Sequence, residues 1–241
     1  MLVSPPPIAF LYEDDALVVV DKPAGVPVVA ALAWPAEACV HARAAAAVGS
    51  RLWVVHRLDR ETSGVLAFAR TAAAHRSLSL AFERREVTKV YQALVAGVPV
   101  PLRGVIELPL HEARKGKARP AVPGEAGAKP AQTGYDVRRA WRHGAAAVSL
   151  LDARPATGRH HQIRVHLRAI GVPILADAVY GRGMRPLPDD HSCPRLALHA
   201  GTLDLPHPDG TRRVVVAAPW PADLAAVTAW LDAQWRVETP A

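Results

Sequence analysis

The chain has 241 residues, half of them hydrophobic, and its 29 basic and 22 acidic side chains give a formal net charge of +7 with a pI near 9.9. This length allows one large domain or two small ones, and two cysteines without a CxxC pair offer no zinc ribbon or redox motif and favour a reducing, cytoplasmic compartment. The N-terminal residues lack the order of a signal peptide, and every apolar run is too short or too interrupted to span a membrane.

The N-terminal part of the chain predicts short strands and helices separated by clear turns. A turn is expected at 21–25, where Pro23 fixes φ and Gly25 permits a positive φ. Thr71 is the expected cap of the second helix. In chain order we expect strands at 10–12, 17–20, 51–55 and 65–69, with helices at 41–48 and 72–85.

The rest of the chain continues this mixture of strands and helices. Residues 111–129 are rich in Lys, Arg, Gly and Pro and show no periodicity, so we expect a basic loop insertion that forms a long mobile loop or arm. Strands are expected at 89–96, 135–140, 146–153, 196–200, 202–205 and 213–217, with helices at 162–170 and 223–230.

The order of these elements indicates the fold class. Strands and helices interleave without strict βαβ alternation, and no repeat or interior linker splits the chain. We therefore expect a single mixed α/β or α+β domain over residues 1–241 rather than a doubly wound sheet.

The most informative segment is residues 56–64, which read His-Arg-Leu-Asp-Arg-Glu-Thr-Ser-Gly. Asp59 lies among basic and titratable side chains, between two strongly apolar segments. This arrangement fits a single carboxylate held at a strand end within a basic rim. Taken alone, Asp59 would more often be a turn cap for Thr62 or Ser63.

Two further segments carry polar residues that apolar packing does not require. Tyr91 lies inside an apolar strand, and Arg164 follows a run of Arg and His at the start of an expected helix. A helix N-terminus attracts anions through its free N–H groups and its dipole. In isolation Tyr91 would more often be a core tyrosine, and Arg164 a surface charge.

The histidines at 160, 161 and 166 raise the question of a metal site. They lack the glutamate and the spacing of a His-Glu-x-x-His motif, and their arginine neighbours disfavour a cation. We expect no metal. The basic excess of the chain, without a lysine-rich tail, is equally consistent with a polyanion partner and with an ordinary basic protein.

Together these segments resemble the RluA-type RNA pseudouridine synthases. The resemblance rests on residues 56–64, on Lys-Val-Tyr-Gln-Ala at 89–93, and on residues 157–167 with Asp177 and Tyr180-Gly181 downstream; it spans about residues 9–225 in the family's order. It implies the pseudouridine synthase catalytic fold, which is an α+β fold with a mixed, mainly antiparallel central sheet and flanking helices and loops. It also implies a monomer that isomerises uridine in rRNA or tRNA without a metal or nucleotide cofactor.

The same resemblance assigns roles to individual residues. Asp59 is the expected catalytic residue, acting either as a nucleophile or as a base, and Arg164 is expected to pair with it. Tyr91 is expected to stack on the target base, and Arg57 to fill the space that the flipped base leaves. The expected phosphate contacts are Arg60, Arg159, His160 and His161.

Two rivals and two departures from the family pattern bear on this interpretation. A non-catalytic RNA-binding or RNA-chaperone protein on the same fold is the main rival, and a hydrolase would usually need a second carboxylate. The catalytic pattern begins by about residue 9, so we expect no S4-type domain and place RNA recognition in the catalytic domain, with 111–129 as the candidate segment. Ala176 stands where the family commonly has Gly, which we interpret as packing variation.

Overall fold

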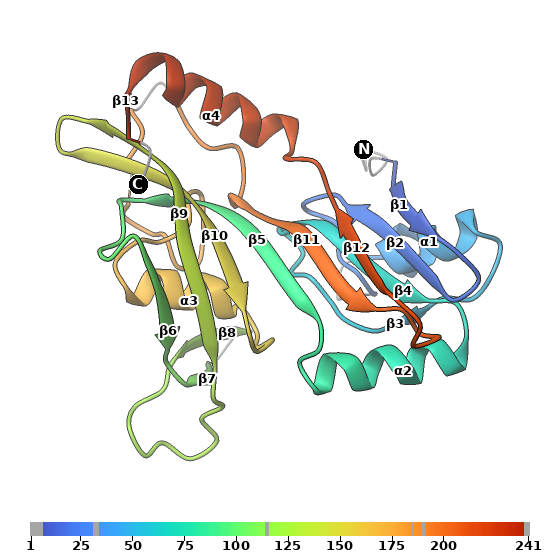
Figure 1. Cartoon of the computed structure of the whole chain (residues 1–241). Coiled ribbons are helices and arrows are strands. Elements are labelled where there is room, and N and C mark those ends of the chain that lie inside the picture. Colours follow the sequence, from blue (N-terminus) through green and yellow to red (C-terminus); the bar gives the residue numbers. More distant parts are fainter. Residues whose placement is uncertain (1–6, 31–33, 114–115, 185, 189–190, 239–241) are drawn as a thin grey trace. The chain divides into compact units, whose positions relative to one another are not determined.

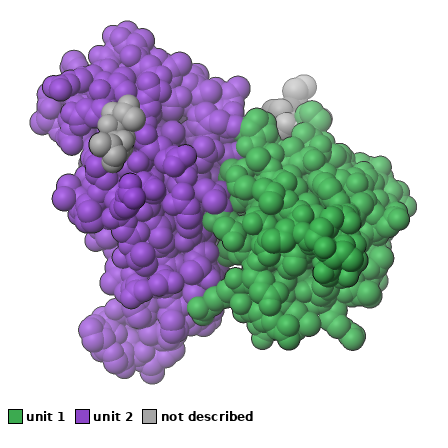
Figure 2. Space-filling view, in the orientation of Figure 1, with its two compact units in different colours: residues 1–89, 200–219 green, residues 90–199, 220–241 purple. Residues whose placement is uncertain are grey.

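The computed structural model describes residues 7–30, 34–113, 116–184, 186–188 and 191–238 (Figure 1). The chain divides into two compact units: unit 1 contains residues 1–89 and 200–219, and unit 2 contains residues 90–199 and 220–241 (Figure 2). The chain passes between the units three times: within β5 (Thr88–Ala96), within β11 (Leu198–Pro206), and between Pro219 and Trp220. The single domain expected from the sequence stays a prediction.

Unit 1 is built around a sheet whose central strands are apolar on both faces. Its strands run in the order β1 (Ala9–Glu13), β2 (Leu17–Lys22), β4 (Ser63–Ala69) and β11, with β3 (Trp53–Val54) on β4 and β12 (Arg213–Ala217) on β11. Every residue of β4 is buried. The helices are η1 (Ala36–Ala38), α1 (Val40–Ala47) and α2 (Ala72–Glu83), of which α2 packs on β3 and β4.

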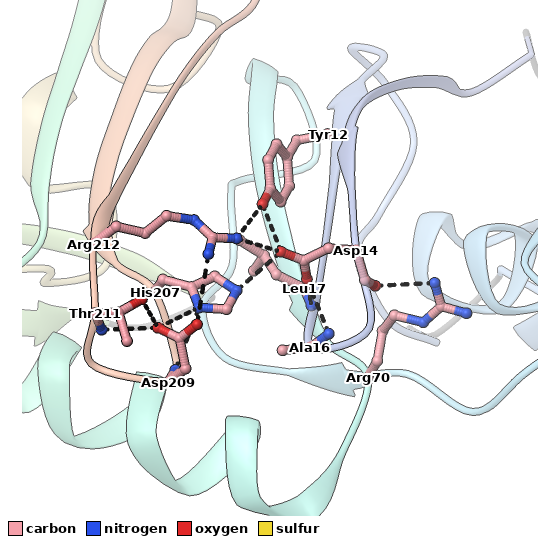
Figure 3. Close-up of polar contacts among 9 residues, drawn as sticks. All are labelled: Tyr12, Asp14, Ala16, Leu17, Arg70, His207, Asp209, Thr211 and Arg212. Carbon is pink, nitrogen blue, oxygen red and sulfur yellow. Dashed lines mark hydrogen bonds and ion pairs between the residues drawn. The ribbon is translucent and has the colours of Figure 1, made fainter.

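A polar cluster fastens the first turn of unit 1 to the turn between β11 and β12 (Figure 3). Asp14 accepts hydrogen bonds from the hydroxyl of Tyr12 (2.5 Å) and from the main-chain N–H of Leu17 (2.8 Å). Its Oδ2 also lies 2.9 Å from Nε2 of His207, whose Nδ1 is 2.7 Å from Asp209. Residues nearly two hundred positions apart in the sequence are therefore joined within this unit.

Unit 2 contains a second group of antiparallel strands. The order is β5, β10 (Ala146–Pro155), β9 (Gln132–His143) and β13 (Arg236–Glu238), with β6 (Arg103–Glu107) also on β9. A separate hairpin is formed by β7 (Leu110–Ala113) and β8 (Lys117–Pro120), and the helices are α3 (Gln162–Ala169) and α4 (Ala222–Gln234). The core includes fully buried Trp141, Leu151, Leu167 and Leu231.

The expected α+β class with mainly antiparallel strands and flanking helices is confirmed. Most expected elements are present within a few residues of their predicted bounds, and Thr71 caps α2 by accepting the N–H of Ala74 (3.0 Å). The strands expected at 196–200 and 202–205 form the single strand β11, because the backbone stays extended through Gly201. β6 and β13 were not expected.

The segment 111–129 differs most from its prediction. Its described residues contain most of the β7–β8 hairpin, and an irregular stretch follows at 121–129 with a single bridge between Leu110 and Lys129; residues 114 and 115 lie outside the described residues. Leu110 and Ala118 are buried in a small cluster with Ala131 and Val165. The hairpin is therefore stabilised by contacts with α3 that short-range sequence periodicity does not reveal.

Candidate active site

Asp59 lies in unit 1, whereas Tyr91 and Arg164 lie in unit 2. The ion pair between Asp59 and Arg164 joins residues of different units and stays a prediction.

Backbone hydrogen bonds hold the Asp59 segment. The N–H of Thr62 donates to the main-chain oxygen of Asp59 (3.1 Å), so the hydrogen bond described for this turn does not use the carboxylate. The next carbonyl, that of Arg60, accepts from the N–H of Gly25 (2.9 Å) and from Nζ of Lys22 (2.9 Å). Asp59 is half-buried, and the flanking Arg57 and Arg60 are exposed. This segment therefore presents a carboxylate from a fixed backbone beside two exposed guanidinium groups.

Lys22 holds the backbone of the Asp59 segment in place, a role that the sequence interpretation missed. Its side chain is fully buried, and Nζ donates to the carbonyls of Pro23 (2.8 Å), Val26 (2.7 Å) and Arg60. Three carbonyl oxygens satisfy the three donors of an ammonium group. Lys22 thus joins the 21–25 turn to the segment that carries Asp59.

His56 holds the start of the same segment in place. Its Nε2 accepts the N–H of Ala67 (3.0 Å), and its ring stacks on Phe82 with centroids 4.8 Å apart. Burial, assisted by the charge of Lys89, lowers the pKa of His56 to about 3. The imidazole is therefore neutral near pH 7, with its proton on Nδ1, and ties residue 56 to β4.

Gly64 ends the segment at a position that excludes any side chain. Its φ is +114°, and a Cβ there would lie 2.2 Å from the main-chain oxygen of Ala200. Real Cβ atoms do not approach backbone so closely. β4 and β11 can therefore lie together at this point only because residue 64 is glycine.

Arg164 is buried in unit 2, so its interpretation as a surface helix charge is wrong. Its side chain is 6% exposed and that of Asp177 is 1% exposed. The guanidinium is bidentate on this carboxylate, with Nε 2.7 Å from Oδ2 and Nη2 2.8 Å from Oδ1. The centre of the guanidinium also lies 5.0 Å from the ring centroid of Tyr180.

Asp177 is itself fixed by the turn in which it lies. Oδ1 accepts the main-chain N–H groups of Val179 (2.9 Å) and Tyr180 (3.0 Å). Burial raises the pKa of Asp177, but the hydrogen bond and charge of Arg164 and these two N–H groups outweigh burial and leave the pKa below its usual value. The carboxylate is therefore ionised at neutral pH.

Tyr91 lies on β5, opposite Ala153 of β10. It is half-buried and packs against the core of unit 2. A half-buried tyrosine on a central strand suits either core packing or stacking on a base.

The basic residues before α3 contact the hairpin and the loop that follows it. Nε of Arg159 donates to the carbonyl of Pro130 (3.1 Å), and Nε2 of His160 lies 2.9 Å from that of Gly116. The rings of His160 and His161 stack with centroids 3.7 Å apart, and Nδ1 of His161 is 2.9 Å from the hydroxyl of Tyr180. Arg159 and His160 remain exposed. Their expected role as phosphate contacts stays a prediction.

Two buried residues complete the start of α3. Gln162 accepts from the hydroxyl of Thr157 (2.7 Å) and the N–H of Arg159 (3.0 Å), and it donates to β9. His166 is fully buried, and both ring nitrogens have protein partners, Thr133 (2.9 Å) and the carbonyl of Leu108 (3.0 Å). His166 is therefore a structural residue and not a metal ligand.

The fold and these motifs define a class of RNA-modifying isomerase. Residues 16–169 match the family model described as RNA pseudouridylate synthase, and the chain belongs to the RluA-type RNA pseudouridine synthases.

Several relatives align with most of the length of this chain. The dual-specificity RNA pseudouridine synthase RluA of Escherichia coli K12 is 38% identical over 219 residues, which cover 89% of this chain and 94% of that protein. The ribosomal large subunit pseudouridine synthase D of Nitrosomonas europaea is 37% identical over 236 residues, which cover 92% of this chain and 64% of that protein.

A solved structure supports the same assignment. The human RNA pseudouridylate synthase domain containing 4 matches with a TM-score of 0.76 and 28% identity, covering 97% of this chain and 95% of that one. The chain is thus an RNA pseudouridine synthase. Among its described helices, none is long and apolar enough to cross a membrane.

Proposed function

We propose that this enzyme converts specific uridines of structured rRNA, tRNA or both to pseudouridine without a cofactor, using Asp59 as its catalytic carboxylate. The observation that carries the proposal is the agreement over 94% of the length of the Escherichia coli relative, a dual-specificity enzyme. The fixed backbone on both sides of Asp59 supports it, because a catalytic group must be held close to its productive geometry. The cytoplasmic location and the monomeric state remain expectations.

The reaction explains why these residue types suffice. The bond between N1 of the base and C1′ of the ribose breaks, the base turns, and a bond forms between C5 and C1′. The proton of C5 is lost and N1 gains one, so atoms and charge balance without a redox step. Positive charge develops on the sugar as the first bond breaks, and a carboxylate can stabilise it, attack it or take a proton.

The other predicted residues serve access and orientation. A uridine within a structured RNA must leave its stack, at a cost of about a few kcal/mol, before its sugar can be reached. We assign to Arg57, which is exposed, the filling of the vacated space, and to Tyr91 the stacking on the extruded base. Arg164 orients the carboxylate of Asp59 through guanidinium N–H donors. Arg60, Arg159, His160 and His161 contact phosphates.

The test is a map of pseudouridine across rRNA and tRNA in cells with the gene, without it, and with the gene carrying Asp59→Asn. We expect one or more sites to vanish without the gene, to return with the wild-type gene and to stay absent with Asp59→Asn. Purified Asp59→Asn protein should still bind the target RNA. Restoration of the sites by Asp59→Asn would refute the catalytic role and favour the rival, an RNA-binding or chaperone protein.

A further inference from the structure

We propose that Asp177 is a positioning residue for RNA modification, which holds the guanidinium of Arg164 in the single orientation that serves the reaction. The inference rests on the proposed function, because it concerns how one of the proposed catalytic residues is placed.

The first support is the number of bonds that fix the carboxylate. Asp177 accepts two N–H groups of Arg164 on two different oxygens, and one of those oxygens also accepts two main-chain N–H groups. Rotation of the carboxylate would break bonds to the backbone as well as bonds to the arginine. The carboxylate therefore acts as a rigid receptor for one edge of the guanidinium.

The second support is the ring of Tyr180, which restricts the plane of the guanidinium. The centre of Arg164 lies 5.0 Å from the ring centroid, within the range of a cation–π contact. The hydroxyl of the same tyrosine accepts the N–H of Ala118 on β8 (2.9 Å), so the ring is held at its far end by the hairpin. Asp177 binds one edge of the Arg164 guanidinium, and Tyr180 limits the plane of this group. The direction in which the opposite edge points is therefore determined.

The third support is the position of the Asp177 turn relative to Tyr91. Leu175 donates its N–H to the carbonyl of Leu94 on β5 (2.9 Å), and Ile174 forms a β-bridge with Val95. The turn that fixes Arg164 is therefore bonded to the strand that carries Tyr91. Within unit 2, Asp177 and Tyr91 are therefore positioned by the same strand, β5, and Arg164 is positioned through Asp177.

These contacts are more than a buried ion pair requires. A carboxylate with a monodentate arginine and water would satisfy the charges, but it would allow several orientations of the guanidinium. The four described donors to Asp177 instead select one. Reaction rates are sensitive to such placement, since a shift of about 1 Å can cost about 100-fold.

The experiment measures release of tritium from RNA transcribed with uridine labelled at C5, containing the site mapped above. Enzyme in excess over RNA gives the single-turnover rate and the half-saturating enzyme concentration. We expect Asp177→Asn to lower the rate about 100-fold and to change the half-saturating concentration less than about 3-fold. Asp177→Glu keeps the charge but displaces the carboxylate, and should lower the rate about 10-fold.

A double-mutant cycle tests whether Asp177 acts by positioning Arg164 or only by supporting the fold. If Asp177 acts through Arg164, Asp177→Asn should slow an Arg164→Met enzyme less than about 3-fold. A control for the loss of a bidentate carboxylate is Asp223→Asn, because Asp223, whose side chain is 41% exposed, also binds an arginine of unit 2, Arg195 (2.6 and 3.1 Å). This control should leave the rate within about 2-fold.

The outcomes are distinct. Absence of tritium release by the wild-type enzyme would count against the proposed function. Two results would overturn the positioning role alone, provided that the wild-type enzyme is active. One is a single-turnover rate of Asp177→Asn within 3-fold of the wild-type rate. The other is that Asp177→Asn slows the Arg164→Met enzyme as much as it slows the wild type. Circular dichroism at the assay temperature establishes folding, and if Asp177→Asn does not fold, Asp177→Glu decides: a rate within 3-fold of wild type would refute the inference.

Discussion

Replacement of Ala176 by glycine should make the protein more stable. Ala176 has φ +55°, in the left-handed region, where an L-residue with a Cβ is disfavoured by about 1–2 kcal/mol. Glycine removes that strain but loses more conformational entropy on folding, a cost of about 0.5–1 kcal/mol. The side chain is exposed, so no buried contact is lost. The net gain should be about 0.5–1 kcal/mol, or about 2 °C in Tm for a chain of this length.

Ala178 provides a matched control two residues away. It is also exposed and lacks a positive φ, so Ala178→Gly has only the entropic cost and should lower the free energy of unfolding by about 0.5–1 kcal/mol. Urea denaturation of the two variants should therefore give changes of opposite sign. Equal destabilisation by both would refute the assignment of backbone strain to residue 176.

The remaining predictions concern three residues that stabilise unit 1, namely Gly64, His56 and Thr71. Gly64→Ala should lower the free energy of unfolding by about 3 kcal/mol or more in urea denaturation, because its Cβ would meet the backbone of Ala200; a loss under 1 kcal/mol would contradict this. Because the folded-state pKa of His56 is about 3, protonation favours the unfolded state below about pH 6.5. Its contribution to stability should therefore fall towards pH 3 by at most about 1.4 kcal/mol per unit, a slope absent from His56→Gln, and parallel pH profiles would disprove it. Thr71→Ala should cost about 1 kcal/mol in thermal unfolding while Thr71→Ser costs little, since only the first loses the cap of α2; equal losses would exclude capping as the cause.

Short-range sequence patterns predicted the features that depend on neighbouring residues in the chain. The apolar run of β4, the cap at Thr71 and the start of α3 near Gln162 follow from periodicity and turn chemistry, and the structure has each of them. The motif around Asp59 was recognised because its residue types are unusual together.

Features that depend on distant contacts were not predicted. The burial of Lys22 follows from three carbonyls, one of them 38 residues away, and no pattern within the 21–25 turn indicates it. Asp177 belonged to the recognised motif, but its pairing with Arg164 appears only when the turn after α3, which is bonded to β5, is in place. The interpretation of Ala176 as packing variation was wrong, because what distinguishes the position is its backbone conformation and not its packing.

The contact between Gly64 and Ala200 also sets an order of events during synthesis. The strand beside Gly64 lies more than a hundred residues further along the chain, so the ribosome completes the Asp59 segment long before β11 exists. At about 5–20 residues per second, this interval is roughly 7–30 s. During it the part of β4 that will lie beside β11 has no partner strand on that side. A nascent chain therefore lacks the strand that packs on Gly64, beside the Asp59 segment, until its last fifth is synthesised.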